Sequence, residues 1–441
     1  MTATPPDVID LLSTLIGFES TNFGEGRSLG ELEAARWIEG LLAEAGYQPQ
    51  LLHRQDSPTR TNVVVRVPGA DRGLPGIVVQ CHLDVVPAEA DQWSTPPFTA
   101  VVRDGWIHGR GSTDMLDTVA GVLATLLEWA DEGVVPRRDV VVAFVADEED
   151  TGAWGAEWLV AEHPELFAGC AASVGEDGAI ATDMVRCDGT TARLYPVACA
   201  ERGTLHMRLT ARGASGHGSR PRGDDAVTRL VEALHRITSH RWPLAMSPVV
   251  RAQLVQTAAA LGIGVDEDDE SSIVAALDEM GPAAAALPWT IRASAVPTMV
   301  QAGYKVNVIP GEATSHLDVR CPPGAHDEVL ATLVDLIGPG VEWEFVAHQM
   351  PVESPLESQW FEAIRATVAH FDPIGIVVPQ CMGGGTDAKA FSKLGLLTYG
   401  FTPVGPDGDR RPTAAHGVDE RNSVAGVRTG QKMWRHFLET V

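Results

Sequence analysis

Residues 139–149 read DVVVAFVADEE, and this stretch decides the fold. The run that ends at Ala146 is short and continuously apolar, which is typical of a strand buried on both faces of a parallel sheet. Glu148 and Glu149 follow it directly. Two adjacent carboxylates repel each other unless a cation or a proton lies between them. A solvated loop is the ordinary interpretation, but the apolar run should hold these residues close to the core.

Strand and helix patterns alternate on both sides of this stretch. Residues 62–67 and 77–80 are short β-branched runs bounded by turn residues, and residues 117–130 carry apolar side chains at helical spacing. The alternation resumes after about residue 355 and ends in a helix near residues 424–438. Interleaved strands and helices predict an α/β fold with a mostly parallel sheet flanked by helices.

The middle of the chain has a different pattern. Residues 204–210 alternate between apolar and polar side chains, as expected of a half-exposed strand. Further strands and helices follow in an order that indicates a compact α+β module with antiparallel character. We therefore predict a catalytic domain built from residues 1–199 and 352–441, interrupted by an inserted smaller domain at residues 200–351. Residues 246–297 fit neither pattern, and their acidic run at 266–270 is typical of a helix start or a surface loop.

Composition excludes several classes of protein. The 441 residues are 44% hydrophobic and 21% charged, which is ordinary for a globular protein. The 33 basic and 59 acidic residues give a net charge of −26, which opposes binding to nucleic acid or to anionic lipid. No apolar run is long enough for a membrane helix, and the first residues lack the basic region of a secretory signal. Six dispersed cysteines without a C-x-x-C pair predict a reducing, cytoplasmic location.

Four further clusters of histidine and carboxylate residues lie where predicted strands give way to loops, which is where open α/β sheets bind ligands. Each is weak alone; Asp114, for example, could simply cap the helix that follows. The H-x-D pair in QCHLDVVP and the glycine turn in HGRGSTDMLD are not specific for a functional site on their own. The clusters are QCHLDVVP with His82 and Asp84, HGRGSTDMLD with Asp114, SVGEDG with Glu176 and Asp177, and AAHGVDER with His416.

Together with Glu148 and Glu149, these clusters offer imidazole and carboxylate groups. Zinc-type ions prefer such ligands at about 2.0–2.2 Å. Two ions about 3.5–4 Å apart need a group that bridges them. The clusters therefore have the chemistry of a site for two metal ions.

All five motifs, in this order and over nearly the whole chain, resemble the co-catalytic zinc metallopeptidases. This family contains aminoacylases, glutamate carboxypeptidases, acetylornithine deacetylases and succinyl-diaminopimelate desuccinylases. The stretch VPTMVQAGYKVNVIPGEATSHLDVR at residues 296–320 is most similar to the aminoacylase and Gly-X carboxypeptidase branch. The resemblance implies that His82 and Glu176 bind one ion, that Glu149 and His416 bind the other, that Asp114 bridges the two, that Asp84 orients His82, and that Glu148 is the general base. Asp177 is the alternative to Glu176.

The resemblance also implies substrate-binding residues. His217 in GHGSRP matches a histidine that reaches the site of a neighbouring subunit and binds the substrate carbonyl, which implies a homodimer. Asn307 and Arg320 match residues that hold the free carboxylate of the substrate, and Gly384 lies in a loop whose backbone approaches the substrate. One departure is Leu116, because the family often has a basic residue there.

The expected activity is hydrolysis of the amide or peptide bond of a small N-acyl amino acid or dipeptide with a free carboxylate. The resemblance implies two divalent ions per chain, Zn²⁺ or alternatively Co²⁺ or Mn²⁺, and a water between them that Glu148 activates. A non-catalytic binding protein on the same fold is the alternative. The sequence does not identify the acyl group.

Overall fold

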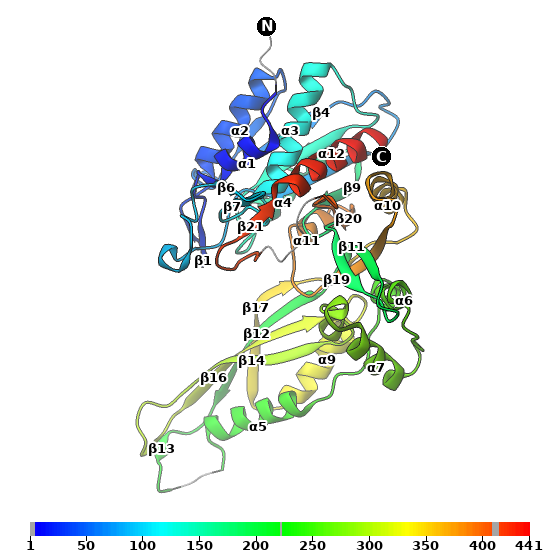
Figure 1. Cartoon of the computed structure of the whole chain (residues 1–441). Coiled ribbons are helices and arrows are strands. Elements are labelled where there is room, and N and C mark those ends of the chain that lie inside the picture. The colour runs from blue at the N-terminus through cyan, green and yellow to red at the C-terminus, as the bar shows by residue number, and fades with distance from the viewer. Residues whose placement is uncertain (1–4, 221–222, 408–413) are drawn as a thin grey trace.

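The computed structural model describes residues 5–220, 223–407 and 414–441 (Figure 1). Its main sheet has six strands, and the four at the centre and one edge run parallel to one another. The other two pair antiparallel. This mixed, mostly parallel sheet confirms the predicted fold class. In sheet order the strands are β20 (Leu397–Gly400), β9 (Cys170–Gly175), β5 (Gly76–His82), β8 (Val140–Val145), β4 (Asn62–Val67) and β3 (Gln50–Leu52).

Strand β8 is buried along its whole length, as the opening stretch predicts. Val140, Val142 and Phe144 belong to one apolar cluster, whereas Val141 and Val145 belong to another. Successive side chains of a strand point to opposite faces, so β8 joins the two layers of helices that enclose the sheet.

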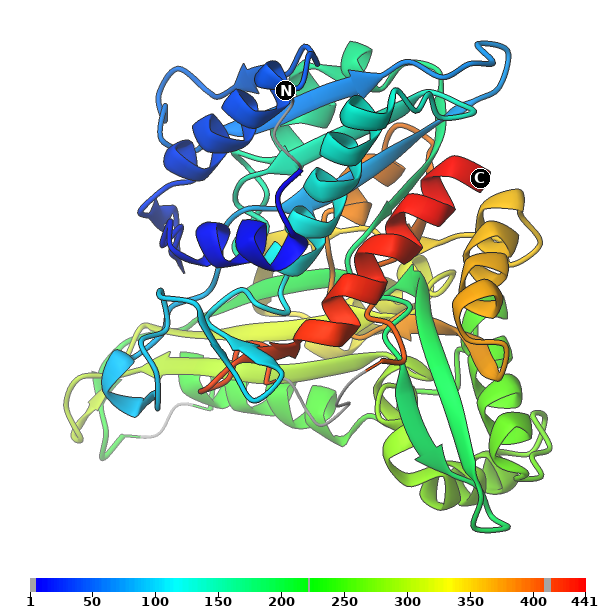
Figure 2. The same ribbon diagram turned by 45° about the horizontal axis from the view of Figure 1, so that its top comes forward.

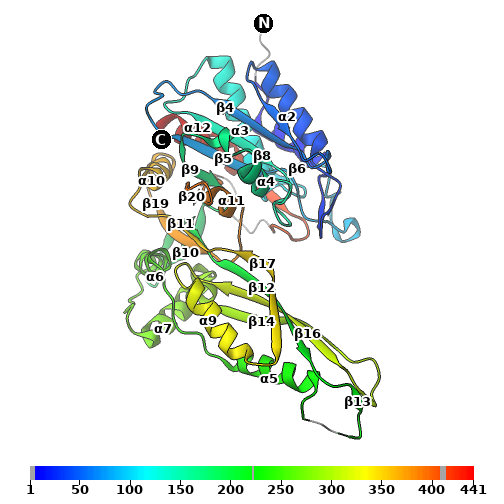
Figure 3. The ribbon, with the colours of Figure 1, turned by 180° about the vertical axis from the view of Figure 1, so that it is seen from behind.

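Helices cover both faces of the main sheet. One layer packs around α3, which contacts α1, α2 and α12, and α12 crosses the front of Figure 2 beside α1 and α3. The opposite face carries the two short helices α4 and α11, which are seen from behind in Figure 3. The bounds are α1 (Val8–Ile16), α2 (Leu32–Glu44), α3 (Leu116–Glu132), α4 (Ala156–Glu162), α11 (Ala388–Ser392) and α12 (Val424–Thr440).

A second sheet extends the α/β part. In it, β11 (Thr191–Glu201) pairs parallel with β19 (Gly375–Met382) and antiparallel with β10 (Thr182–Val185) and β18 (Val352–Glu353). Helix α10 (Gln359–Phe371) and helix α6 (Pro248–Leu261) both contact β19.

The middle of the chain forms a separate antiparallel sheet, below the main sheet in Figure 1. Strand β12 alternates buried and more exposed side chains, and its buried residues pack with α5 and α9 in a cluster of their own. Beyond this sheet, β13 (Gly216–His217) pairs with β15 (Val308–Ile309) to form an arm. The sheet is β14 (Ser294–Ala302), β16 (Glu312–Cys321), β12 (Gly203–Arg212) and β17 (Val341–Gln349), and its helices are α5 (Ala226–Ser239) and α9 (His326–Ile337).

The segment that fitted neither sequence pattern is helical. It contains α6, α7 (Glu270–Met280) and the short α8 (Leu287–Thr290), and Asp269 caps α7 by accepting a hydrogen bond from the Ser271 amide. Leu254, Ile273 and other buried residues of these helices belong to the same apolar cluster as the main sheet. These helices therefore pack with the α/β part, although they lie inside the range predicted for the insert. The boundaries of the insert stay a prediction.

Shorter elements complete the described chain. The hairpin of β6 (Val101–Arg103) and β7 (Trp106–His108) pairs with β21 (Arg421–Ser423), which brings the C-terminal part of the chain beside the loop before α3. A small ribbon joins β1 (Asn22–Gly24) and β2 (Arg27–Ser28). None of the helices in the described segments combines the length and apolar character needed to cross a bilayer.

Candidate functional site

Side chains from five distant segments meet at the carboxyl ends of β5, β8 and β9. His82 is the last residue of β5, Glu148 and Glu149 follow β8, and Glu176 follows β9. Parallel neighbouring strands end at the same edge of a sheet, so these residues are brought together by the topology. Asp114 enters from the loop before α3, and its peptide bond to Met115 is cis. His416 enters from the loop before β21.

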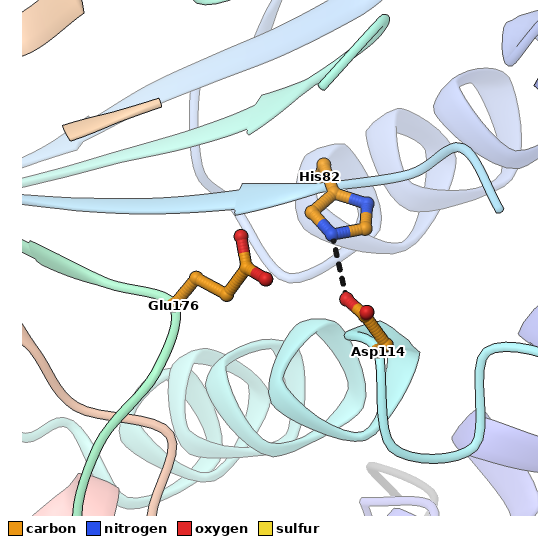
Figure 4. Close-up of side chains that lie close together, drawn as sticks. All are labelled: His82, Asp114 and Glu176. Carbon is orange, nitrogen blue, oxygen red and sulfur yellow. Dashed lines mark hydrogen bonds and ion pairs between the residues drawn. The ribbon is translucent and has the colours of Figure 1, made fainter. Parts of the chain in front are cut away.

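Two groups of three side chains share Asp114. His82, Asp114 and Glu176 form the first, and Asp114, Glu149 and His416 form the second, with the donor atoms of each group within 4.8 Å of one another. Figure 4 shows the Glu176 carboxylate directed toward His82 and Asp114. His82 Nε2 lies 3.1 Å from one Asp114 oxygen, and His416 Nε2 lies 2.9 Å from the other. His416 Nε2 is also 3.2 Å from Glu149.

The opposite side of the His82 ring is held by the backbone. Its Nδ1 lies 2.8 Å from the carbonyl oxygen of Asp84 and donates to it, which leaves Nε2 facing Asp114. The Asp84 carboxylate is farther away, at 3.8 Å from Nδ1. It accepts hydrogen bonds from the backbone amides of Glu148 and Glu149, each at 3.2 Å. Asp84 thus contacts both the first group and the loop that carries Glu148.

The electrostatics of the cluster favour positive charge. Burial and the neighbouring Glu176 raise the pKa of Glu148 well above its usual range. Burial and Asp114 raise the pKa of Glu176 in the same way. Hydrogen bonds to the carboxylates of Asp114 and Glu149 raise the pKa of His416 to about 10. For Asp114, burial opposes ionisation, but the hydrogen bonds from His416 and His82 outweigh it and lower the pKa. Carboxylates that resist ionisation beside imidazoles that retain protons indicate an excess of negative charge.

This donor set fits two divalent ions. Each group offers one imidazole nitrogen and two carboxylates, and Asp114 has one oxygen for each group. Imidazole and carboxylate are the ligands that zinc-type ions prefer at such sites, and a dication would replace the protons as the source of positive charge. Asp177, the alternative to Glu176 in SVGEDG, is engaged elsewhere, because it accepts a hydrogen bond from Gln380 at 2.9 Å.

A buried ion pair that the sequence did not reveal holds two of the contributing loops. Glu420 accepts hydrogen bonds from the backbone amides of Gly111 and Thr113, just before Asp114. It also pairs with Arg110 at 2.6 Å, and Arg110 donates to the carbonyl of Gly417 at 3.1 Å. Both charges lie within motifs singled out above, HGRGSTDMLD and AAHGVDER. The opposite charges of Arg110 and Glu420 are the feature of the sequence that could have indicated this pair, but their contact depends on long-range packing.

A cleft of about 530 Å³ opens beside the cluster, a volume typical of small-molecule sites. Glu148 lines it on the side of the main sheet, and Arg320 lines it on the side of the insert. Arg320 is held by Asp318 at 2.7 Å and donates to Thr204 at 3.1 Å. The remaining lining residues are mostly polar: Asp150, Thr151, Gly152, Glu157, Thr204, His206, Ala347, Gln349, Gly385, Thr386, Asp387 and Ala390.

The other residues predicted to bind substrate do not line this cleft in one chain. Gly384 lies in open space, whereas the adjacent Gly385 lines the cleft. His217 and Asn307 are exposed and lie together on the β13–β15 arm, at the end of the insert remote from the main sheet (Figure 1). Ser219 donates its backbone N–H to His217 Nδ1 at 3.2 Å, so Nε2 carries the ring proton. Neither His217 nor Asn307 belongs to a donor group or lines the cleft of its own chain.

The sequence matches the profile of the peptidase family M20/M25/M40 over residues 78–440. The chain belongs to this family. The match confirms the family inferred from the motifs and, with it, the predicted reaction class, hydrolysis of a peptide or amide bond. Within the family, the chain is similar to the N-fatty-acyl-amino acid synthase/hydrolase PM20D1 of Homo sapiens, with 28% identity over 83% of this chain and 74% of that protein.

One further relative and one solved structure are also similar to this chain. Aminoacylase-1 of Sus scrofa is 26% identical over 87% of this chain and 84% of its own. The M20 family metallo-carboxypeptidase Sso-CP2 from Sulfolobus solfataricus has the same fold, with a TM-score of 0.70 and 16% identity over 98% of this chain and 99% of its own.

Proposed function

We propose that this protein is a hydrolase that uses two divalent metal ions to cleave the amide bond of small N-acyl amino acids or dipeptides with a free carboxylate. The observation that carries the proposal is the pair of donor groups that share Asp114. His82 and Glu176 would hold one ion, Glu149 and His416 the other, and Asp114 both. Zn²⁺ is the proposed metal because the donors are imidazole and carboxylate, with Co²⁺ and Mn²⁺ as alternatives.

The bound ions would supply Lewis-acid polarisation of the substrate carbonyl and would lower the pKa of water at the site. Glu148 is the proposed general base. It lines the cleft and is not a member of either donor group, so its carboxylate is free to accept a proton from the attacking water. Glu148 would then deliver this proton to the leaving nitrogen. Asp84 holds the backbone of this residue.

The substrate class rests on the cleft and on the relatives. Arg320 faces the cleft across from Glu148, and a guanidinium can bind a carboxylate through two parallel hydrogen bonds. The relatives include an N-fatty-acyl-amino acid synthase/hydrolase, an aminoacylase and a metallo-carboxypeptidase. These names agree with a substrate that carries an amide beside a free carboxylate.

We propose further that the active form is a homodimer in which the arm of one chain reaches the cleft of the other. His217 would donate Nε2–H to the substrate carbonyl oxygen, and Asn307 would contact the substrate beside Arg320. The insert, residues 200–351, would act as lid and dimerisation domain. A cytoplasmic location agrees with the six cysteines, all free and four of them buried.

A substrate panel tests the proposal. The protein reconstituted with Zn²⁺, Co²⁺ or Mn²⁺ should hydrolyse at least one N-acyl amino acid or dipeptide, should bind about two ions per chain by atomic spectroscopy, and should lose activity with a chelator. Amides without the carboxylate should be poor substrates. Metal-loaded protein that turns over none of the panel would favour a binding protein instead.

A further inference from the structure

A network of buried polar side chains fixes the loop that carries Glu148. The first link is the Asp84 carboxylate, which is completely buried and accepts the amides of Glu148 and Glu149. Asn22 donates to the same carboxylate at 2.8 Å through its side-chain amide. A carboxylate with three donors is confined to one position, and so are the donors.

Asn22 links Asp84 to a second carboxylate. Its amide nitrogen lies 3.2 Å from Asp147, the residue immediately before Glu148. Asp147 has a positive φ of 69°, which is uncommon for a residue other than glycine. Its other oxygen accepts from the Thr151 hydroxyl at 3.2 Å and from the Trp154 amide at 3.4 Å. The Asp147 side chain therefore fixes the turn in which Glu148 and Glu149 lie.

Arg60 supplies the positive charge of this chain of groups. It donates to Asp147 at 2.7 Å and to both oxygens of Glu31 at 3.1 Å, and its guanidinium lies 5.4 Å from the centre of the Trp154 ring. Glu31 is completely buried, and burial together with the charge of Asp84 raises its pKa to about 8. Removing a buried partner leaves the remaining charges uncompensated, which is costly.

Asn22, Glu31 and Arg60 lie outside the cluster motifs, do not line the cleft and belong to neither donor group. They come from the N-terminal segment: Asn22 from β1, Glu31 from the start of α2, and Arg60 from the turn before β4. Asn22 and Arg60 contact the carboxylates of Asp84 and Asp147. Asp84 in turn accepts the backbone amides of Glu148 and Glu149. This placement suits control of the proton-transfer geometry.

We propose that Arg60 and Asn22 are positioning residues that act through Asp147 and Asp84 to hold Glu148 at the angle needed for proton transfer. The inference rests on the proposed function, since it gives Glu148 the role of general base. It predicts that loss of either residue lowers kcat while substrate and metal binding persist, because neither residue contacts Arg320 or a donor side chain, and the network holds Glu149 only through its backbone amide.

Arg138 provides a matched control. It is another buried arginine of the same domain, but it donates to the carbonyls of Val441 and Pro75 and stacks on Trp360, at the opposite end of β8. Arg60→Met and Asn22→Ala should lower kcat about 10–100-fold with KM within about twofold and about two ions per chain retained. Arg60→Lys keeps the charge but not the planar fork and should lose less. Arg138→Met should reduce stability but leave kcat close to that of the wild type.

Amide hydrogen exchange gives a readout that does not need turnover. In the variants at positions 22 and 60, peptides covering residues 147–154 should exchange about tenfold faster than in the wild type, because the donors to Asp84 and Asp147 are loosened. In Arg138→Met they should not change. If Arg60→Met fails to fold, Arg60→Lys and Asn22→Ser provide the same comparison.

Equal kcat losses in the position-60 and position-138 variants, a loss expressed in KM, or unchanged exchange at residues 147–154 would overturn the inference. If the wild type hydrolyses no amide at all, the proposed function fails, and faster exchange in the variants would still show that the network holds this loop.

Discussion

The donor cluster and the β13–β15 arm differ in how deeply most of their polar side chains are buried. In the cluster, His82 and Asp84 are completely or almost completely buried, Asp114, Glu149 and Glu176 are partly buried, and His416 is exposed. On the arm, His217 and Asn307 are exposed and remote from the main sheet (Figure 3). The cluster has its geometry within one chain. The arm carries residues whose proposed use depends on another chain.

This difference separates the residues proposed for the chemical step from those proposed for substrate recognition. Groups that must hold charge are built onto strand ends, where packing fixes them before substrate binds. Groups proposed to recognise substrate lie on the insert. We therefore expect substitutions in the cluster to affect the chemical step, and substitutions on the insert to affect binding or to be compensated by a second subunit.

The largest effect is expected for Glu148→Gln. The amide cannot accept a proton, so kcat should fall by about 10²–10⁴ or more while about two metal ions remain bound. Glu157→Gln is a matched control, because Glu157 lines the same cleft but pairs with Lys393 at the surface. The test is to measure kcat by steady-state kinetics and the number of bound metal ions for both variants. Near-wild-type activity of Glu148→Gln would show that another group is the base.

His217→Ala should lower kcat by about 10²–10³, the usual cost of losing one donor to the developing oxyanion. In an equal mixture with Glu148→Gln, each heterodimer would have one site with both residues intact. Random exchange of subunits should then restore about a quarter of the wild-type activity. Full activity of a strictly monomeric form, or no recovery on mixing, would contradict the proposed use of the arm across the subunit boundary.

Arg320→Lys should raise KM about tenfold or more and change kcat less, because lysine cannot form two parallel hydrogen bonds to a carboxylate. Arg208→Lys is the control, since Arg208 lies on the neighbouring strand β12 and pairs with Glu344 on the surface. Steady-state kinetics with a carboxylate substrate and its amide analogue show whether the change in KM depends on the substrate carboxylate. An equal KM change for both substrates would argue against carboxylate recognition by Arg320.

The smallest effect on activity is expected in helix α6. Leu254→Ala should reduce the free energy of unfolding by about 2–5 kcal/mol, because Leu254 is fully buried in the cluster of the main sheet. The exposed Val231→Ala on α5 should change it by less than about 0.5 kcal/mol. Denaturant unfolding measures both, and kcat should be unchanged. A negligible cost for Leu254→Ala would mean that α6 does not share the main core.

Local patterns were sufficient for the elements that carry the cluster. Strand β8, helix α3 and the terminal helix α12 lie within a few residues of their predicted ranges, because each has a single strong periodicity. The donor residues follow strand ends or lie in short glycine-containing motifs. The sequence therefore placed His82, Glu149 and Glu176 at one edge of the sheet, and the structure brings them together.

Other features depend on contacts that no local pattern records. Asn22, Glu31 and Arg60 are single polar residues in segments without a motif, and only folding brings them beside Asp84 and Asp147. The alanine-rich α6 has apolar residues on several faces, so its sequence does not indicate which sheet it covers. The pairing of β11 with β19 joins strands on either side of the insert, which local propensity cannot predict.

The central claim is that the five side chains hold two metal ions with Asp114 between them. Anomalous X-ray diffraction from crystals of the zinc-loaded protein tests it most directly. We expect two peaks, each about 2.0–2.2 Å from an Asp114 oxygen, one beside His82 and Glu176 and the other beside Glu149 and His416. A single peak, or peaks away from Asp114, would contradict the account.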